Sequence, residues 1–364
     1  MADFNYSRVD LARRRRGLTK SKLATDSGLS TRMLRKYEQG SEPTPATIER
    51  LATVLEFPVA FFYGDTLDEP NAEGVSFRAL SSLSVTKSQQ ALASSTLALA
   101  LAKWIDERFE LPMPDVPDYR GSDPVTAAEA LRERWGLGER PVANMVHLLE
   151  SRGIRVFSLA EEYAEVDAFS FWRDACPYVF LNTMKTVERS RMDAAHELGH
   201  LVLHGHGGPT GRQAEHEAQA FGSAFLMPES SVVARIARGA TLTQLIEAKF
   251  FWKVAAFNLV HRAHALELIS EWQYRSMCIA LSKRGRENEP RQMRTSETSQ
   301  VLSKVFRALR AESVDRGDVA ADLHIPADEL SKSVFGYMLR SIDGGSQAPD
   351  AVEAPQDRPS LRVV

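Results

Sequence analysis

Two histidines four residues apart, in the segment AAHELGHLVLHG at residues 194–205, constrain this chain more than any other feature of its sequence. The apolar residues around them predict a helix, and four residues are just over one helical turn, so the side chains of His196 and His200 project from one face. Two imidazoles so placed can bind one divalent ion, while Glu197 can polarise a water molecule on that ion. The segment therefore has the pattern of a zinc-hydrolase helix.

The same pattern also arises by chance on a solvated helix, where the histidines would form only a polar surface stripe. Burial decides between the two interpretations. Small and apolar residues surround the motif and mark a buried helix, in which an unpaired histidine or glutamate costs free energy unless a metal ion binds it. These residues are Ala194, Ala195, Leu198, Leu201 and Val202.

A catalytic zinc site needs a third protein ligand and an open fourth position. The next predicted helix supplies the ligand if it runs back antiparallel across the helix that carries His196 and His200, which we call the metal helix. Glu215 is favoured, because Ala218 on the same face permits close approach and Gln219 offers an amide that can hold the ligand in place. Glu217 is the alternative, followed by His216. We expect zinc as the ion, with manganese as the alternative for nitrogen and oxygen donors.

Three short strands are predicted before the metal helix, from the segments IRVFSL, DAFSFWR and YVFLN. The last strand, residues 178–182, is the expected edge strand along which an extended substrate would lie. His204 and Tyr178 are candidates for stabilising an oxyanion, although His204 equally extends the polar stripe of the metal helix. Glu188 and Arg191 are expected to form a structural ion pair.

Residues 1–64 predict a five-helix domain that binds DNA. Thr19 can cap the second helix, the turn GLS follows, and Ser30 can cap the third, which is the spacing of a helix-turn-helix. Residues expected to pack these two helices together are Leu23, Ala24, Leu29, Leu34 and Tyr37. Residues expected to face DNA are Lys20, Thr31, Arg32, Arg35 and Lys36. A small protein-interaction domain is the alternative interpretation.

Charge separates this front domain from the rest of the chain. Residues 1–64 hold 11 Lys and Arg against 7 Asp and Glu, whereas the remainder holds 34 against 41. A basic front on an acidic body indicates that only the front meets a polyanion. If the domain acts as a homodimer, we expect an inverted-repeat operator with half-sites one helical turn apart.

The rest of the chain divides into four predicted segments. Residues 65–123 predict a linker and connector helix, residues 124–240 the core that carries the two histidines, and residues 241–340 a helical region for docking or dimerisation. Residues 341–364 lack aromatic residues and periodicity and predict a disordered tail. The fold class is mainly α with a small sheet, in α+β order.

The expected location is the cytoplasm. The most apolar run, residues 91–104, is shorter than the ~20 residues of a membrane span, so it predicts a buried or interdomain helix. No secretory leader is recognised, and two cysteines in the whole chain fit a reducing compartment. No membrane partner is expected.

The segment from Thr19 to Gly40 reads TxxxLAxxxGLSxxxLxxYExG, and through it the front domain resembles the phage-repressor-like (XRE) helix-turn-helix family. The resemblance implies a domain that binds a double-stranded DNA operator. Lys20 departs from the family, which very often has glutamine at the start of the second helix.

The segments SFWRDACPYVFLN, ERSRMDAAHELGHLVLHG and AEHEAQAFGSAFLMP resemble the ImmA/IrrE family of metallo-endopeptidases, over about residues 139–280. The resemblance implies a zincin-like protease whose known members cut a repressor and thereby release genes. It assigns zinc binding to His196, His200 and Glu215, and the general base to Glu197. The family usually has asparagine where this chain has Gln219, and phenylalanine where it has Met192.

Two functions follow from these expectations. The first is a DNA-binding transcriptional regulator whose zinc endopeptidase domain cleaves a repressor or other regulatory protein in a stress or mobile-element response. The second is a transcription factor whose zincin domain only senses a metal, a ligand or a protein. The presence of Glu197 favours the first, because a pure sensor needs no general base.

Overall fold

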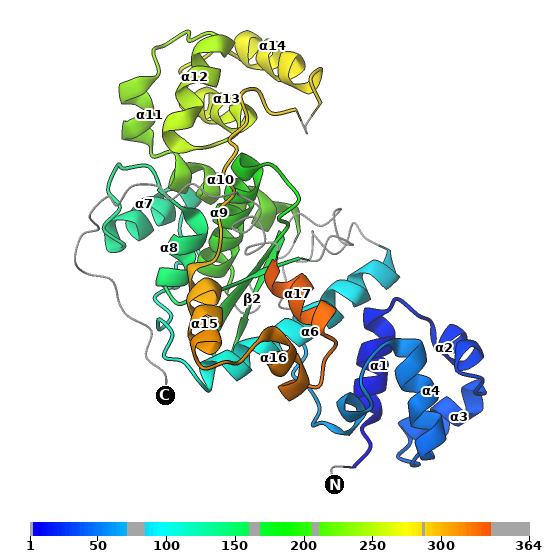
Figure 1. Ribbon diagram of the computed structural model, residues 1–364. Helices are drawn as coiled ribbons and strands as arrows, with labels where there is room; N and C mark the ends of the chain where they lie inside the picture. The colour runs from blue at the N-terminus through cyan, green and yellow to red at the C-terminus, as the bar shows by residue number, and fades with distance from the viewer. Residues whose placement is uncertain (1–2, 71–83, 160–167, 206–210, 286–287, 336–364) are drawn as a thin grey trace.

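The structure, a computed structural model, describes residues 3–70, 84–159, 168–205, 211–285 and 288–335 (Figure 1). It is mostly helical with one three-stranded mixed sheet, which confirms the predicted fold class. Among the helices described, none combines the length and the apolar character that crossing a membrane requires. The predicted tail at 341–364 lies outside the described residues.

Five helices form the front domain, as predicted, and the last is a 3-10 helix. They are α1 (Tyr6–Arg15), α2 (Lys20–Asp26), α3 (Thr31–Glu38), α4 (Pro45–Leu55) and η1 (Val59–Tyr63). The hydroxyl of Thr19 caps α2 by accepting from the backbone N–H of Lys22 at 3.0 Å. Ser30 caps α3 in the same way through Met33, at 3.2 Å. All five residues predicted to pack α2 against α3 are buried.

Helix α6 (Val85–Asp106) joins this domain to the rest of the chain and is buried along much of its length. Alanine, serine and threonine are buried on it beside leucine, so neighbouring elements approach closely from several sides. The helix packs against α1 and shares one hydrophobic cluster with a face of the sheet (Figure 1). The apolar run at 91–104 is therefore an interdomain helix.

The sheet contains β1 (Arg155–Ser158), β2 (Ala168–Arg173) and β3 (Cys176–Leu181) in the order β1-β3-β2. Strand β3 pairs parallel with β1 and antiparallel with β2, so both of its backbone edges are hydrogen-bonded. The expectation that residues 178–182 form the edge strand is therefore wrong. The antiparallel strand β2 is the edge strand that lies against the metal helix.

The two faces of the sheet belong to two different hydrophobic clusters, because successive side chains of a strand point to opposite faces. Aromatic rings stack across the face that meets α6; they are Phe157, Phe169, Phe171, Tyr178 and Phe180. Smaller aliphatic residues cover the opposite face, namely Val156, Ala168, Val179 and Leu181. That smoother face receives the metal helix.

The second hydrophobic cluster, on the aliphatic face of the sheet, contains the metal helix, which carries His196 and His200, and the helices packed with it. They are α7 (Pro124–Arg134), α8 (Met145–Ser151), α9 (Val187–Leu203), α10 (Arg212–Leu226), α11 (Glu229–Arg235), α12 (Leu242–Trp252), α13 (Ala256–Ala265) and α14 (Glu271–Ser282). The cluster runs on to Leu281, so the boundary predicted at residue 240 does not coincide with a break in the core. Helices α11–α14 extend the metal-helix unit away from the front domain (Figure 1).

The last three described helices belong instead to the first hydrophobic cluster, which contains α6 and the aromatic face of the sheet. They are α15 (Gln300–Ala311), α16 (Arg316–Asp322) and α17 (Ala327–Phe335). Glu329 on α17 is 1% exposed and accepts from Arg15 on α1 at 2.6 Å and from Arg16 at 2.7 Å. The region predicted at 241–340 is thus divided between two cores, and its acidic end contacts the front domain of the same chain.

Two buried charges of α9 reach the segment between α14 and α15. Glu188 accepts from Lys249 at 2.9 Å and from the backbone N–H of Met293 at 2.9 Å. Arg191 pairs with Glu297. The predicted pair between Glu188 and Arg191 is therefore wrong, because each has its own partner from a distant part of the chain.

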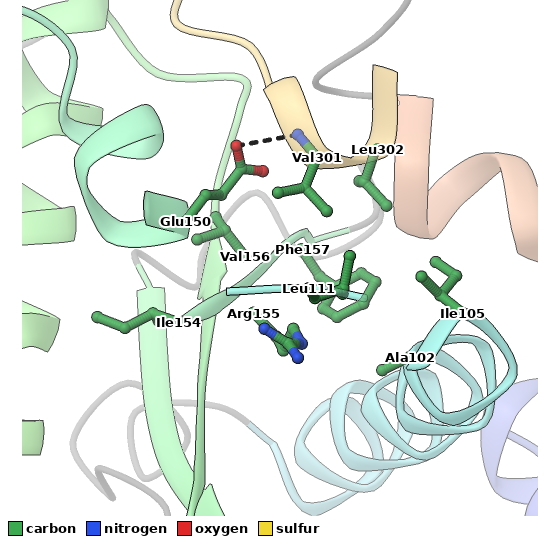
Figure 2. A pocket seen from close by; sticks show the side chains of 10 residues that line it. All are labelled: Ala102, Ile105, Leu111, Glu150, Ile154, Arg155, Val156, Phe157, Val301 and Leu302. Atoms are coloured by element: carbon green, nitrogen blue, oxygen red, sulfur yellow. Dashed lines mark hydrogen bonds between the residues drawn. The ribbon is translucent and has the colours of Figure 1, made fainter. Parts of the chain in front are cut away.

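Glu150 on α8 anchors the start of α15. Its carboxylate accepts from Ser299 and from the backbone N–H groups of Gln300, at 2.9 Å, and Val301, at 3.2 Å. The group borders a cavity of about 20 Å³ between α6, β1 and α15 (Figure 2). Burial raises the pKa of Glu150 to about 7, although these hydrogen bonds and the charge of Lys304 oppose the shift.

We predict that Glu150 makes the fold less stable as the pH rises. The native carboxyl keeps its proton up to about pH 7, whereas the unfolded one loses it near 4.5. Its contribution is therefore fully present below pH 4.5 and declines as the pH rises to about 7. Urea-unfolding midpoints measured across this range should fall in the wild type relative to Glu150→Gln. Parallel curves for the two proteins would contradict the assignment.

Candidate metal centre

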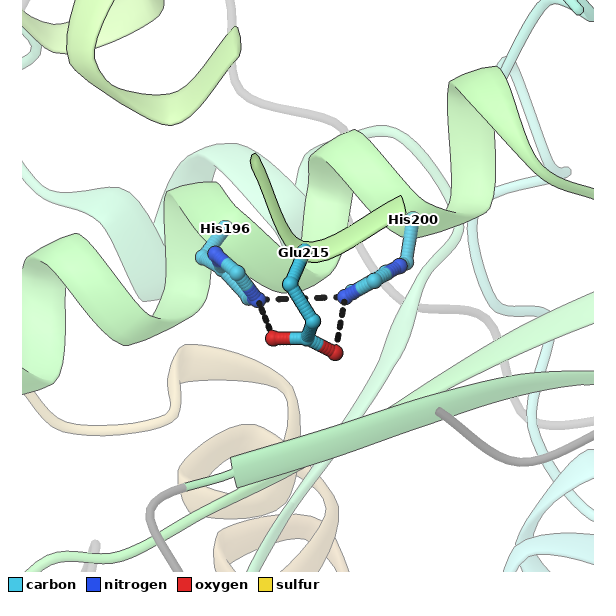
Figure 3. A group of neighbouring side chains, drawn as sticks. All are labelled: His196, His200 and Glu215. Carbon is cyan, nitrogen blue, oxygen red and sulfur yellow. Dashed lines mark hydrogen bonds and ion pairs between the residues drawn. The ribbon is translucent and has the colours of Figure 1, made fainter. Parts of the chain in front are cut away.

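His196 and His200 lie on consecutive turns of α9, and their Nε2 atoms are 3.1 Å apart (Figure 3). The helix begins after Thr186, whose hydroxyl accepts from the N–H of Arg189 at 3.4 Å. It ends at His204 and Gly205, and the glycine has a φ of 50°, a conformation that side chains with a Cβ rarely adopt. The motif therefore occupies the last two turns of a well-bounded helix.

Glu215 on α10 completes the group. Its two carboxylate oxygens lie 3.4 Å from Nε2 of His196 and 3.5 Å from Nε2 of His200 (Figure 3). The three side chains offer ligand atoms that all lie within 4.8 Å of one another. Of the predicted candidates for the third ligand, the structure brings Glu215 to the histidines.

Close contact between α9 and α10 permits this arrangement. A Cβ added to Gly199 would lie 3.1 Å from the Cα of Ala218, and one added to Gly222 would lie 3.1 Å from the backbone nitrogen of His196. Larger residues at these positions would separate the helices. Because Ala218 contacts Gly199 while the later Gly222 contacts the earlier His196, the two helices run antiparallel, as expected.

The electrostatics of the group fit a cation. Burial works against ionisation of Glu215, but its hydrogen bonds with His196 and His200 hold its pKa well below the usual range. Burial also disfavours the charged form of His196, yet the hydrogen bond to Glu215 and the charge of Glu197 raise its pKa above the ordinary value. Two imidazole nitrogens and one carboxylate that face a single point form a donor set that zinc accepts.

Glu197 lies beside the group and is 3% exposed. Ser170 on β2 donates a hydrogen bond to its carboxylate at 2.7 Å. Sequence reasoning missed this serine. The available signal was a polar residue between Phe169 and Phe171 in an apolar strand, on the face opposite the aromatic rings.

The two expected oxyanion helpers lie elsewhere. Tyr178 stacks on Phe171 on the face of the sheet that meets α6, so its hydroxyl points away from the histidines. His204 directs Nδ1 at Nδ1 of His200, at 3.0 Å, and Nε2 at Glu217, at 2.9 Å. Neither side chain faces the point on which the ligand atoms converge.

Glu217, rather than Gln219, takes the supporting place behind the candidate ligands. In the part of the chain described, no hydrogen bond joins Gln219 to Glu215; Gln219 is exposed and lines a cavity of about 310 Å³ together with Asp193. Glu217 contacts His204, and His204 in turn contacts the candidate ligand His200. The third candidate ligand, His216, is exposed.

The predicted DNA-facing residues lie on the surface of the front domain. Thr31, Arg32, Arg35 and Lys36 are exposed on α3, with Arg32 in its first turn and Arg35 and Lys36 in its last. Lys20, at the start of α2, forms an ion pair with Glu38 at 2.8 Å. That pair engages the side chain at the position where the sequence departs from the XRE pattern.

We predict that Gly222→Val weakens zinc binding by about tenfold or more, the scale on which disturbed support of a ligand acts. The new side chain would press on Met192 and on the backbone of His196 and so displace Glu215. Valine is a better helix former than glycine, so lost helix propensity does not explain such a result. Competition with a chelator measures the affinity.

The matched control for this prediction is Ala220→Val, a β-branched residue at a partly exposed position of the same helix. It should leave the zinc affinity near the wild-type value. Equal affinities for Gly222→Val and the wild type would show that the spacing of α9 and α10 does not set the position of Glu215.

Comparison with known families agrees with this geometry. Residues 149–264 match the peptidase family described as the IrrE N-terminal-like domain, a range that includes the sheet, α9 and α10. Residues 10–62 match a helix-turn-helix family. No curated protein matches the chain. The chain thus carries an IrrE N-terminal-like domain of the peptidase family, behind an N-terminal helix-turn-helix DNA-binding domain.

Proposed function

We propose that this protein is a DNA-tethered zinc endopeptidase that cleaves a regulatory protein, with a repressor as the expected substrate. The observation that carries the proposal is the convergence of His196, His200 and Glu215 on one point, with the carboxylate of Glu197 one residue from the first histidine. A buried carboxylate at that position has a use in hydrolysis and none in metal binding alone.

The residues divide the work of peptide hydrolysis among them. When bound, a zinc ion supplies a Lewis acid that polarises the scissile carbonyl and makes water acidic near neutral pH. Glu197 accepts the proton of the attacking water and returns it to the leaving amine. The hydrogen bond from Ser170 fixes the carboxylate of Glu197 against the sheet. A bound ion would offset the cost of burying these charged groups.

The edge of β2 supplies the path for the substrate. Among the described strands, β2 pairs only with β3, and its other edge carries backbone groups that an extended peptide can bind. Because Ser170 lies in this strand and contacts Glu197, a peptide bound along β2 passes beside the general base. This replaces the path along residues 178–182.

The front domain supplies the tether. Helix α3 exposes Arg32, Arg35 and Lys36, which suit the phosphates and base edges of a major groove. We propose that a homodimer binds an inverted repeat through two copies of this helix. The peptidase domain would then lie close to proteins that bind the same operator.

A sensor without turnover is the second candidate, and one observation favours it. The front domain, α6 and one face of the sheet share a single hydrophobic cluster, so a ligand that moves the sheet can alter the DNA-binding helices without any cleavage. Both functions use the same metal site, and they differ in whether a peptide bond is broken.

We predict that the zinc-loaded chain cleaves a partner repressor and that Glu197→Gln lowers the rate by about 10²- to 10⁴-fold, the usual contribution of a general base. Elemental analysis should find zinc, rather than manganese, in both proteins, and little metal in His196→Ala. The test mixes each protein with repressors encoded near its gene and follows cleavage by mass spectrometry. Equal cleavage by both, or none with fully loaded wild type, would favour the sensor.

We predict that Arg35→Ala weakens operator binding and reduces the salt dependence of that binding. Loss of one phosphate contact lowers the slope of log K against log salt by about 0.9. Lys22→Ala is the matched control, because Lys22 is exposed on the neighbouring helix and pairs with Asp26. Fluorescence anisotropy at several salt concentrations compares the proteins, and identical slopes for the two variants would remove α3 from the interface.

A further inference from the structure

We propose that His204 and Glu217 are positioning residues that hold His200 in the tautomer able to bind a metal ion. The inference rests on the metal site of the proposed function and adds to it two residues that contact no reacting atom. His204 is 6% exposed, so its imidazole is removed from water almost completely. A buried imidazole needs partners for both ring nitrogens, and the structure supplies them.

His200, His204 and Glu217 form a continuous line of side chains that leads away from the ligand point, the place where the ligand atoms of the candidate metal site converge. His200 turns Nε2 towards Glu215 and Nδ1 towards Nδ1 of His204, at 3.0 Å. His204 turns Nε2 towards Glu217, at 2.9 Å. Gln213 donates its side-chain N–H to the other oxygen of Glu217, at 2.9 Å. Each nitrogen between the ligand point and the carboxylate therefore has one defined neighbour.

Proton positions follow from the end of this line. A carboxylate only accepts hydrogen bonds, so Nε2 of a neutral His204 must carry the proton that it shares with Glu217. Nδ1 of His204 then holds a lone pair and accepts from Nδ1–H of His200. A neutral imidazole carries one proton, so when a metal ion takes the place of the hydrogen bond between His200 and Glu215, the lone pair of His200 lies on Nε2, the atom that faces Glu215 and His196.

The opposite arrangement would oppose metal binding. If Nδ1 of His204 carried the proton, it would donate a hydrogen bond to Nδ1 of His200. The single proton of His200 would then lie on Nε2, which would present an N–H to the ion. Glu217 prevents this by fixing the direction of the first hydrogen bond. The carboxylate therefore acts on the metal ligand through an intervening histidine, a longer version of the carboxylate–histidine support common at zinc sites.

The packing of α10 explains why one helix supplies both groups. Because α10 runs antiparallel to α9, its first turns lie against the last turns of the metal helix. Glu215 reaches His200 from this position, and Glu217 reaches His204 one turn further along α9. The same contact therefore sets the ligand and its support.

The first test measures zinc affinity by competition with a chelator. His204→Leu and Glu217→Ala should bind zinc about 10- to 100-fold more weakly than the wild type. His204→Asn should recover most of the loss, because its amide oxygen can accept from Nδ1–H of His200. His216→Asn is the matched control on α10 and should bind as the wild type does. Equal affinities for His204→Leu and His204→Asn would overturn the proposal.

The second test uses wild-type protein and so does not depend on how the variants fold. Two-bond ¹H–¹⁵N correlation spectra of the zinc-loaded chain, labelled in histidine, report the tautomer of each imidazole. His204 should be neutral with its proton on Nε2. A proton on Nδ1 would overturn the proposal. A wild type that binds no zinc would instead refute the metal site itself, whereas tight binding that is unchanged in His204→Leu would refute only this inference.

Discussion

The close contact between α9 and α10 is the constraint on which the candidate site depends. Because Gly199 and Gly222 carry no Cβ, the backbones of the two helices approach closely, and the carboxylate of Glu215 reaches two imidazoles that one helix alone could only present to solvent. The smooth aliphatic face of the sheet presses on α9 from the other side and brings Ser170 to Glu197. Packing at small and apolar residues of α9, α10 and the sheet thus positions the three candidate ligands.

The sheet separates two cores and belongs to both. Its aromatic face joins α6, the front domain and α15–α17, while its aliphatic face joins the metal helix and α11–α14. The helix-turn-helix domain and the candidate metal centre therefore lie on opposite sides of one three-stranded sheet. Trp104 on α6 donates to Asp322 on α16 at 3.0 Å, which fastens the C-terminal helices to the connector.

The sequence predicted those features whose residues lie close together along the chain. Caps at Thr19 and Ser30, and the histidine spacing, lie within a few residues of one another, and the third ligand lies on the next helix beside a small residue. Strand order was beyond reach, because a strand buried on both sides and one at an edge are equally apolar here. The partners of Glu188 and Arg191 lie 61 and 106 residues away, and nothing in the periodicity of a helix identifies them. Tyr178 was misplaced because the face that its strand presents follows from register.

The buried carboxylate of Glu329 bears on how such a fusion can be taken apart or recombined. A helix-turn-helix module on a flexible string could be exchanged for another by a simple crossover of genes. In this chain a replacement domain would need arginines at the positions of Arg15 and Arg16. Without them the carboxylate of Glu329 would be buried without its partners. The front domain and the C-terminal helices of this chain are therefore expected to change together.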